Sequence, residues 1–162
     1  MAPSVHIGSE ASLNIQTSMM TIDVEAYYTG NSPEATNKFN VAILQNNTLG
    51  PQVGGNMGNN YVHQHRLISM VTGQWGVDIN NTTTGSLYSN QFSYSIPAEL
   101  NDVPVNVEDL EVVVFVAETT QSITSGHGTL PSYVGISASD INLKSVSEIN
   151  PTCLVSISPV FT

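Results

Sequence analysis

The sequence predicts an all-β protein, a two-sheet β-sandwich of jelly-roll or Greek-key type with about eight to nine strands. Apolar residues recur at every second position in several short runs, which is the period of a half-buried strand. Clusters of Gly, Pro, Asn and Ser separate these runs, and no segment sustains a helical period. Charged residues make up only 10% of the chain, with Asn, Ser, Thr and Gln in their place. This exchange is typical of exported β proteins, and a helix content below about a tenth is expected.

Four segments show the alternation of apolar and polar residues that predicts a half-buried strand. Their apolar positions are Met20 to Tyr28, Phe39 to Ile43, Phe92 to Ile96, and Val155 with Ile157. His6 falls in the region of a first strand. Turn clusters are predicted to connect the strands at 29–37, 46–60, 78–86, 101–106, 124–132 and 148–152. The stretch 104–111 can form one short helical turn.

The run from Val112 to Ala117 is apolar on both faces of an extended chain. Such a run predicts a central strand that is covered on both sides, with a long loop as one candidate cover. Val112, Val114 and Phe115 are therefore predicted to lie in the core. On that basis the change Phe115→Ala is expected to cost ~3–5 kcal/mol of stability.

The 162 residues have the length of one domain, so residues 1–162 are interpreted as a single β-sandwich. The first residues contain neither a basic region nor an apolar run, so no signal peptide or membrane anchor is predicted within the chain. The chain is then either cytosolic or a mature or excised piece of an exported protein. Its richness in Asn, Ser and Thr favours the exported piece.

The balance of charge excludes one class of function. Thirteen acidic residues stand against Lys38, Arg66 and Lys144, which gives a formal net charge of −10. Nucleic acid binding needs clustered Lys and Arg, so it is excluded. Docking to anionic lipid is disfavoured for the same reason, and membrane contact is expected only through an anchor outside this chain. No cofactor motif is present and no cofactor is predicted. The lone Cys153 is interpreted as a small buried apolar residue rather than a nucleophile.

Two of the four histidines, His63 and His65, lie in a segment at 61–68 that is predicted as one strand. They would share a strand face with Tyr61 and Leu67. Because that face is half apolar, buried imidazoles that hydrogen-bond their neighbours are favoured. A metal site is an alternative, and so is general acid–base catalysis. A metal ion would need a further ligand from an acid or from the remaining histidines, His6 and His127.

Two unique residues follow in the same stretch. Arg66 is the only arginine and is predicted to pair with a buried acid, for which its planar guanidinium is suited. Trp75 is the only tryptophan and lies between glycines in "GQWG". It is predicted to anchor the core or its rim at a tight bend, with stacking on a ligand as the alternative.

Two stretches resemble a known protein family. They are "NVAILQNN…GPQVGG…NNYVHQHRLISMVTGQWGVDI" and "LEVVVFVAETTQSITSG", within about residues 15 to 126. Both are similar to the Omp28-related outer membrane proteins of Bacteroidetes. The resemblance implies an exported, lipid-anchored cell-envelope protein, of which this chain is the β-rich C-terminal portion. Some family members carry a thioredoxin-like domain upstream. The resemblance implies a location and a fold rather than a reaction.

The leading functional hypothesis is a non-catalytic binding or interaction module at the cell envelope, outer membrane-associated or surface-exposed. Its partner is expected to be an unknown protein or glycan at the cell surface. The loops at 45–60 and 121–132 are predicted to form the binding edge. The candidate binding residues are Trp75, Tyr61, Arg66 and Tyr133. One alternative is a metal-dependent jelly-roll enzyme that uses His63 and His65. Another is a structural packing domain for an upstream thioredoxin-like unit.

Overall fold

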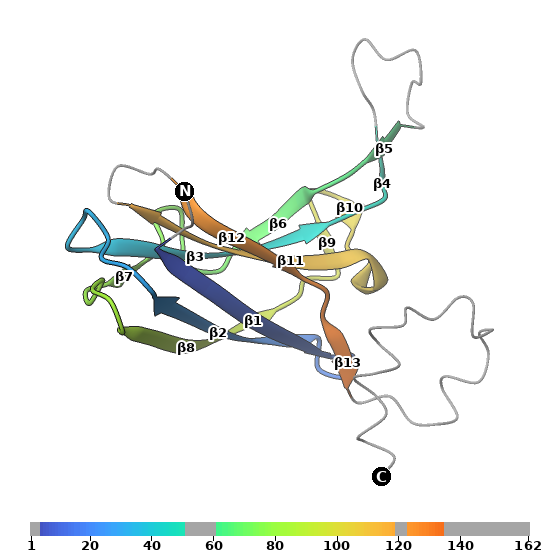
Figure 1. Cartoon of the computed structure of the whole chain (residues 1–162). Helices are drawn as coiled ribbons and strands as arrows, with labels where there is room; N and C mark the ends of the chain where they lie inside the picture. The colour runs from blue at the N-terminus through green and yellow to red at the C-terminus, as the bar shows by residue number, and fades with distance from the viewer. Residues whose placement is uncertain (1–3, 51–60, 119–122, 135–162) are drawn as a thin grey trace, which may run out of the picture.

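The computed structural model describes residues 4–50, 61–118 and 123–134 of the chain. These residues form two main β-sheets that pack face to face (Figure 1). The first sheet contains, in spatial order, β13 (Ser132–Val134), β1 (Val5–Asn14), β2 (Met19–Tyr28) and β8 (Leu87–Ser95). The second contains β12 (Ile123–Thr129), β11 (Leu110–Glu118), β3 (Asn37–Gln45) and β6 (Arg66–Met70), while β7 (Val77–Ile79) pairs with the first part of β3.

Two short ribbons and one helical turn complete the described structure. The ribbons are β4 (Thr48–Gly50) with β5 (Tyr61–His63), and β9 (Glu99–Leu100) with β10 (Val103–Pro104). The 3-10 turn Val107–Asp109 is capped by Asn106, whose side chain accepts a hydrogen bond from the Glu108 amide. The all-β prediction is confirmed, and so is the short helical turn within 104–111.

The connections between strands repeatedly cross from one sheet to the other. Such crossings join β2 to β3, β7 to β8, β8 to β11 and β12 to β13. As a result β2 pairs with β8, although five strands separate them in the sequence. This arrangement is of the predicted Greek-key type rather than a meander of tight hairpins.

The core lies between the two sheets and follows the predicted alternation. In β2 the side chains at alternate positions from Met20 to Tyr28 are almost fully buried, while the residues between them are exposed or half-buried. The second sheet contributes an equivalent set, namely Phe39, Val41, Ile43, Leu110, Val112, Val114 and Val116. Each such aliphatic side chain stabilises the fold by about 1.5–3 kcal/mol relative to its exposed state.

The central position predicted for the run Val112 to Ala117 is confirmed, because β11 pairs with β12 on one side and with β3 on the other. Val112 and Val114 are fully buried as predicted. The prediction for Phe115 is wrong. Phe115 points to the outer face of the sheet and is only half-buried, because side chains alternate across a strand and its neighbours at 114 and 116 occupy the core.

The predicted turn at 124–132, and with it the predicted binding loop at 121–132, is wrong over residues 123–129, whereas Leu130 and Pro131 form the short connection to β13. Residues 123–129 form strand β12. Of its two glycines, Gly128 lies close to a neighbouring side chain, whereas Gly126 leaves ordinary contact distances for a Cβ. A Cβ at Gly128 would lie 2.8 Å from Glu111 Oε1, and one at Gly126 would lie 3.6 Å from Phe115 Cβ. Glycine within a strand often marks such a close approach.

The predicted strand around Val155 and Ile157, and Cys153, lie outside the described residues. Within the described ranges, no helix has the length and apolar content needed to cross a bilayer.

Candidate functional site

The histidine-containing segment is not one strand. It divides into β5 and β6, and His65 between them has a left-handed backbone with φ of 57°. Asn47 stands between β3 and β4 on the neighbouring chain segment and is also left-handed, with φ of 56°. The backbone therefore changes direction in both segments. The β4–β5 pair consequently leaves the body of the sandwich as a projecting ribbon (Figure 1).

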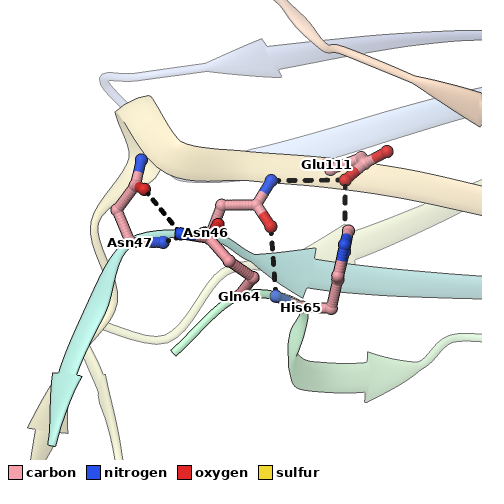
Figure 2. A network of polar contacts seen from close by, with 5 residues as sticks. All are labelled: Asn46, Asn47, Gln64, His65 and Glu111. Atoms are coloured by element: carbon pink, nitrogen blue, oxygen red, sulfur yellow. Dashed lines mark hydrogen bonds and ion pairs between the residues drawn. The ribbon is translucent and has the colours of Figure 1, made fainter. Parts of the chain in front are cut away.

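A polar network holds the base of this ribbon (Figure 2). Gln64 Nε2 donates to Asn47 Oδ1 at 3.0 Å, and the Asn47 amide donates back to Gln64 Oε1 at 3.4 Å. The His65 amide donates to Asn46 Oδ1 at 3.1 Å. Asn46 Nδ2 in turn donates to Glu111 Oε2 at 3.3 Å, and His65 Nδ1 lies 3.7 Å from the same oxygen. The two segments that carry the left-handed residues are thus joined to each other, and Asn46 and His65 contact Glu111 on β11.

The base is also joined to the 3-10 turn that precedes β11. The Asn46 amide donates to the main-chain oxygen of Asp109 at 2.9 Å. Asn47 Nδ2 donates to the Asp109 carboxylate at 3.2 Å. These contacts make the base an ordered platform, although most of the participating side chains are solvent-accessible.

The ribbon itself has two different faces. On one face Leu49 and Val62 are directly paired across the strands, with 64% and 43% of their surfaces exposed. On the other face the rings of Tyr61 and His63 meet edge-to-face with centroids 4.8 Å apart. The His63 ring lies over Gly50, since a Cβ at Gly50 would come within 3.3 Å of His63 Cδ2. The ribbon therefore presents an exposed apolar pair on one side and a packed aromatic pair on the other.

The strand break corrects the interpretation of the two histidines. His63 and His65 do not share a strand face, and the His65 side chain is 64% exposed rather than buried. No group of three or more His, Cys, Asp or Glu residues in the described ranges is arranged to hold a metal ion. The chemistry that this neighbourhood supports is hydrogen bonding and apolar contact.

Arg66 does not pair with a buried acid, so that prediction is wrong. Its guanidinium donates to main-chain oxygens of the β9–β10 ribbon, at 2.6 Å to Leu100, 3.4 Å to Val103 and 3.3 Å to Pro104. The planar guanidinium can serve several convergent carbonyl oxygens at once, which an ammonium group does less well. Arg66 therefore holds the β9–β10 ribbon next to the start of β6.

Trp75 lies on the turn between β6 and β7, is 60% exposed and does not pack against the core cluster, so the predicted anchor of the core or its rim is wrong. The predicted tight bend is confirmed, because Gly73 and Gly76 have φ of 77° and 76°. Tyr133 lies on β13 in the other sheet, where its hydroxyl donates to the Val107 carbonyl at 2.8 Å. The predicted binding residues are therefore spread over several elements. Of these residues, Tyr61 lies on the projecting ribbon and Arg66 lies at the start of β6, next to the base of the ribbon.

Sequence reasoning missed the residues that shape this site. Asn46-Asn47 was interpreted as part of a loop, although Asn is the residue after Gly that most readily adopts a left-handed backbone. Leu49 and Val62 carried no signal, because two isolated apolar residues on either side of a long polar segment do not reveal that they pair. No sequence pattern singled out Glu111, which directly precedes the apolar run from Val112 to Ala117.

The family model that matches this chain is described as outer membrane protein Omp28, and it covers residues 2–125. The chain belongs to the Omp28 family. It is therefore a domain of an outer membrane lipoprotein family, and its place is the cell envelope, in association with the outer membrane. The search of curated proteins gave no match.

Two solved structures resemble the Omp28-family domain described above. One is the crystal structure of a domain of the outer membrane lipoprotein Omp28 from Porphyromonas gingivalis. It has a TM-score of 0.59 and 16% identity, and the match covers 82% of this chain and 92% of that one. The other is HBP35 of Porphyromonas gingivalis, with a TM-score of 0.65 and 14% identity, covering 80% of this chain and 41% of that one. At such identities the likeness shows the fold alone.

Proposed function

We propose that this Omp28-family domain is a non-catalytic binding module of the cell envelope, and that the β4–β5 ribbon is its contact surface. The observation that carries the proposal is the exposed pair Leu49 and Val62 on an element that projects from the sandwich (Figure 1). Exposed apolar side chains gain free energy when other apolar surface covers them, and a binding partner can supply that surface.

The base of the ribbon supports the same function. A contact surface binds more tightly when it is ordered before the partner arrives, because less conformational entropy is lost on binding. The paired amides of Asn47 and Gln64, together with the link from Asn46 to Glu111, fix the direction in which the ribbon leaves the sheet. The ribbon is thus presented in one orientation.

A protein partner at the cell surface fits this surface better than a glycan. The exposed pair is aliphatic, and aliphatic contacts are typical of the dry centre of a protein interface. A glycan would instead favour an exposed aromatic platform. Trp75 offers one on the β6–β7 turn, at a separate position from the ribbon.

Site-specific photocrosslinking on intact cells tests the proposal. A photoreactive amino acid is placed at Val62, 43% exposed, and for comparison at Ile15, which is 40% exposed on the turn between β1 and β2. The position at Val62 is expected to give a discrete crosslinked protein that the position at Ile15 does not give. The double change Leu49→Ser, Val62→Ser is expected to remove the binding of that protein, whereas Ile15→Ser retains it.

Equal crosslinking from both positions, or none from Val62, would remove the support for the ribbon as a contact surface. Crosslinking to another part of the same polypeptide would instead favour the packing-domain alternative. In the similar structure of HBP35, more than half of the chain lies outside the matched region, so a polypeptide of that length has a further part that could make such a contact.

A further inference from the structure

Strand β8 forms one edge of the first sheet, and within the described ranges no strand pairs with its outer side. It runs for nine residues, Leu87–Ser95, in unbroken antiparallel register with β2. Edge strands in natural proteins are usually protected by charged residues, proline, a bulge or short length. This strand contains no charged residue and no proline, and its register with β2 has no bulge.

The main-chain groups of β8 divide into two alternating sets. At the two ends of the pairing, the Tyr28 amide donates to the Ser86 oxygen at 2.9 Å and the Ile96 amide donates to the Ser18 oxygen at 2.8 Å. Even-numbered residues of β8 therefore bond to β2, because hydrogen-bonded pairs alternate in an antiparallel ladder. Odd-numbered residues turn their amides and carbonyls outward, at positions 87, 89, 91, 93 and 95.

We propose that a second copy of this chain docks on that edge, with the two β8 strands antiparallel about a two-fold axis at Gln91. An antiparallel strand pair is compatible with such an axis, so one edge can serve both partners. In this register Leu87 lies opposite the partner's Ser95, and Ser89 lies opposite the partner's Ser93. All five outward-facing residues then form hydrogen-bonded pairs. The first sheet of one copy joins the first sheet of the other into one continuous sheet.

The side chains on the core-facing side of β8 suit this pairing. Tyr88, Phe92 and Tyr94 alternate along that side and are only half-buried in one copy. The same register places Tyr88 opposite the partner's Tyr94, and Phe92 opposite the partner's Asn90. Aromatic cross-strand pairs contribute roughly 0.2–1 kcal/mol each, and they would cover rings that the sandwich leaves partly open.

The distribution of charge favours this edge for two copies of an acidic chain. Each copy has a formal net charge of −10, so most surfaces would repel a second copy. On the paired strand β2, Asp23 and Glu25 lie opposite Gln91 and Ser89. Three strand spacings would separate Asp23 from its counterpart, about 14 Å, which exceeds the ~8 Å screening length at physiological salt.

One local contact opposes the docking. Asn90 Oδ1 accepts a hydrogen bond from the outward amide of Gln91 at 2.8 Å, while Asn90 Nδ2 donates to the Tyr88 hydroxyl at 3.0 Å. The Asn90 side chain therefore occupies the centre of the edge in the single copy and must turn away when a partner strand arrives. It weakens the association without blocking the other four outward positions.

A register-specific disulfide tests the proposal in the full chain with Cys153→Ser. The variant Gln91→Cys places its thiol at the two-fold axis, where paired Cα atoms about 5.5 Å apart allow a disulfide. The matched variant Ser93→Cys places the two thiols more than about 12 Å apart along the strands, which is too far. Mild oxidation is expected to give a covalent dimer with the first variant and a monomer with the second.

Sedimentation of the untagged protein provides the second measurement. The unmodified chain is expected to shift from monomer to dimer as its concentration rises, and Asn90→Ala is expected to lower the concentration at the midpoint several-fold. The double change Ser89→Glu, Ser93→Glu sets like charges opposite each other and is expected to leave a monomer. Gln16→Glu with Gln74→Glu adds the same charge at exposed turns and is expected to leave the dimer intact.

Three results would overturn the proposal. They are a monomer at every concentration, equal crosslinking by both cysteine variants, and a dimer that survives the two glutamates on β8. With Cys153 retained, an internal disulfide from Gln91→Cys would also overturn it, because the chain's own C-terminal residues would then occupy this edge.

Discussion

Asn37 Nδ2 donates a hydrogen bond to the Tyr28 hydroxyl at 2.8 Å, and this contact joins the last residue of β2 in one sheet to the first residue of β3 in the other. Both residues are almost completely buried. Ser32 completes the arrangement, because its hydroxyl donates to Asn37 Oδ1 at 3.0 Å. The polar contact therefore fixes the point where the chain first crosses between the sheets.

Removing this hydroxyl is expected to destabilise the fold. Tyr28→Phe leaves Asn37 Nδ2 buried without its acceptor, which costs about 1–3 kcal/mol. The control is Tyr27→Phe, since Tyr27 is 48% exposed on the opposite face of the same strand. Urea unfolding at neutral pH measures both variants, and equal losses would contradict the role given to the Tyr28–Asn37 contact.

The same tyrosine predicts a loss of stability in alkali. Burial raises the pKa of Tyr28 above its ordinary value of 10.0, an effect that the hydrogen bond from Asn37 partly offsets. The unfolded chain therefore loses this proton at lower pH than the folded chain, so the free energy of unfolding falls as the pH rises above 10.0. Below that pH the contribution is fully present. The difference between wild type and Tyr28→Phe is expected to shrink across this range, and a constant difference would contradict the assignment.

Two phenylalanines on neighbouring strands are expected to respond differently to truncation. Phe39 is fully buried, so Phe39→Ala is expected to cost ~3–5 kcal/mol. Phe115 is half-buried on the outer face, so Phe115→Ala is expected to cost less, about 1–2 kcal/mol. Chemical denaturation of the two variants checks the order of the losses. A larger loss at Phe115 would show that another part of the protein covers that face.

The two glycines of the β6–β7 turn form another matched pair. Both are left-handed, but a Cβ at Gly73 would meet nothing within 4 Å, whereas one at Gly76 would lie 2.6 Å from the Phe39 carbonyl oxygen. Gly73→Ala is expected to cost about 1–2 kcal/mol from backbone strain alone. Gly76→Ala adds a clash with backbone and is expected to cost at least about 1 kcal/mol more. Thermal unfolding of both variants measures the difference, and equal melting temperatures would contradict it.

The histidine pair is expected to behave as a structural feature. His65 is mostly exposed and His63 packs on Tyr61, so the double change His63→Gln, His65→Gln is expected to cost only about 1 kcal/mol. Addition of Zn²⁺ or Cu²⁺ is expected to leave the melting temperature of the wild type unchanged. A rise of several degrees in the wild type and not in the double variant would restore the metal hypothesis.

The β-sandwich could be predicted because its core strands obey a simple period. The alternation from Met20 to Tyr28 is the burial pattern that the structure has. In β3 the apolar positions Phe39, Val41 and Ile43 are buried as predicted, but Asn40 and Ala42 between them are buried too, so this strand is not half-buried. The same period failed where both faces of a strand are apolar. At β11 it could not decide which of Val114 and Phe115 faces the other sheet, because the answer depends on the register with β3 and β12.

The candidate site was less predictable because it depends on backbone exceptions. A single left-handed residue at His65 converts one predicted strand into two and changes the direction of every side chain before it. Histidine is enriched among the few non-glycine residues with positive φ, but the large majority of histidines do not adopt it, so the residue type alone did not predict the break. The glycines of β12 misled in the opposite direction, since their composition indicates a turn while residues 123–129 form a strand, in which Gly128 lies close to Glu111.

The separation between ribbon and core has a consequence for how this protein can change over time. None of the described residues in 46–50 and 61–65 belongs to the hydrophobic cluster between the sheets. Substitutions at the exposed ribbon positions Leu49 and Val62 therefore alter what the molecule touches while costing little of what keeps it folded. Descendants of one ancestral domain can exchange the ribbon's chemistry step by step, each remaining soluble and correctly assembled, and so acquire new recognition without passing through an unstable intermediate.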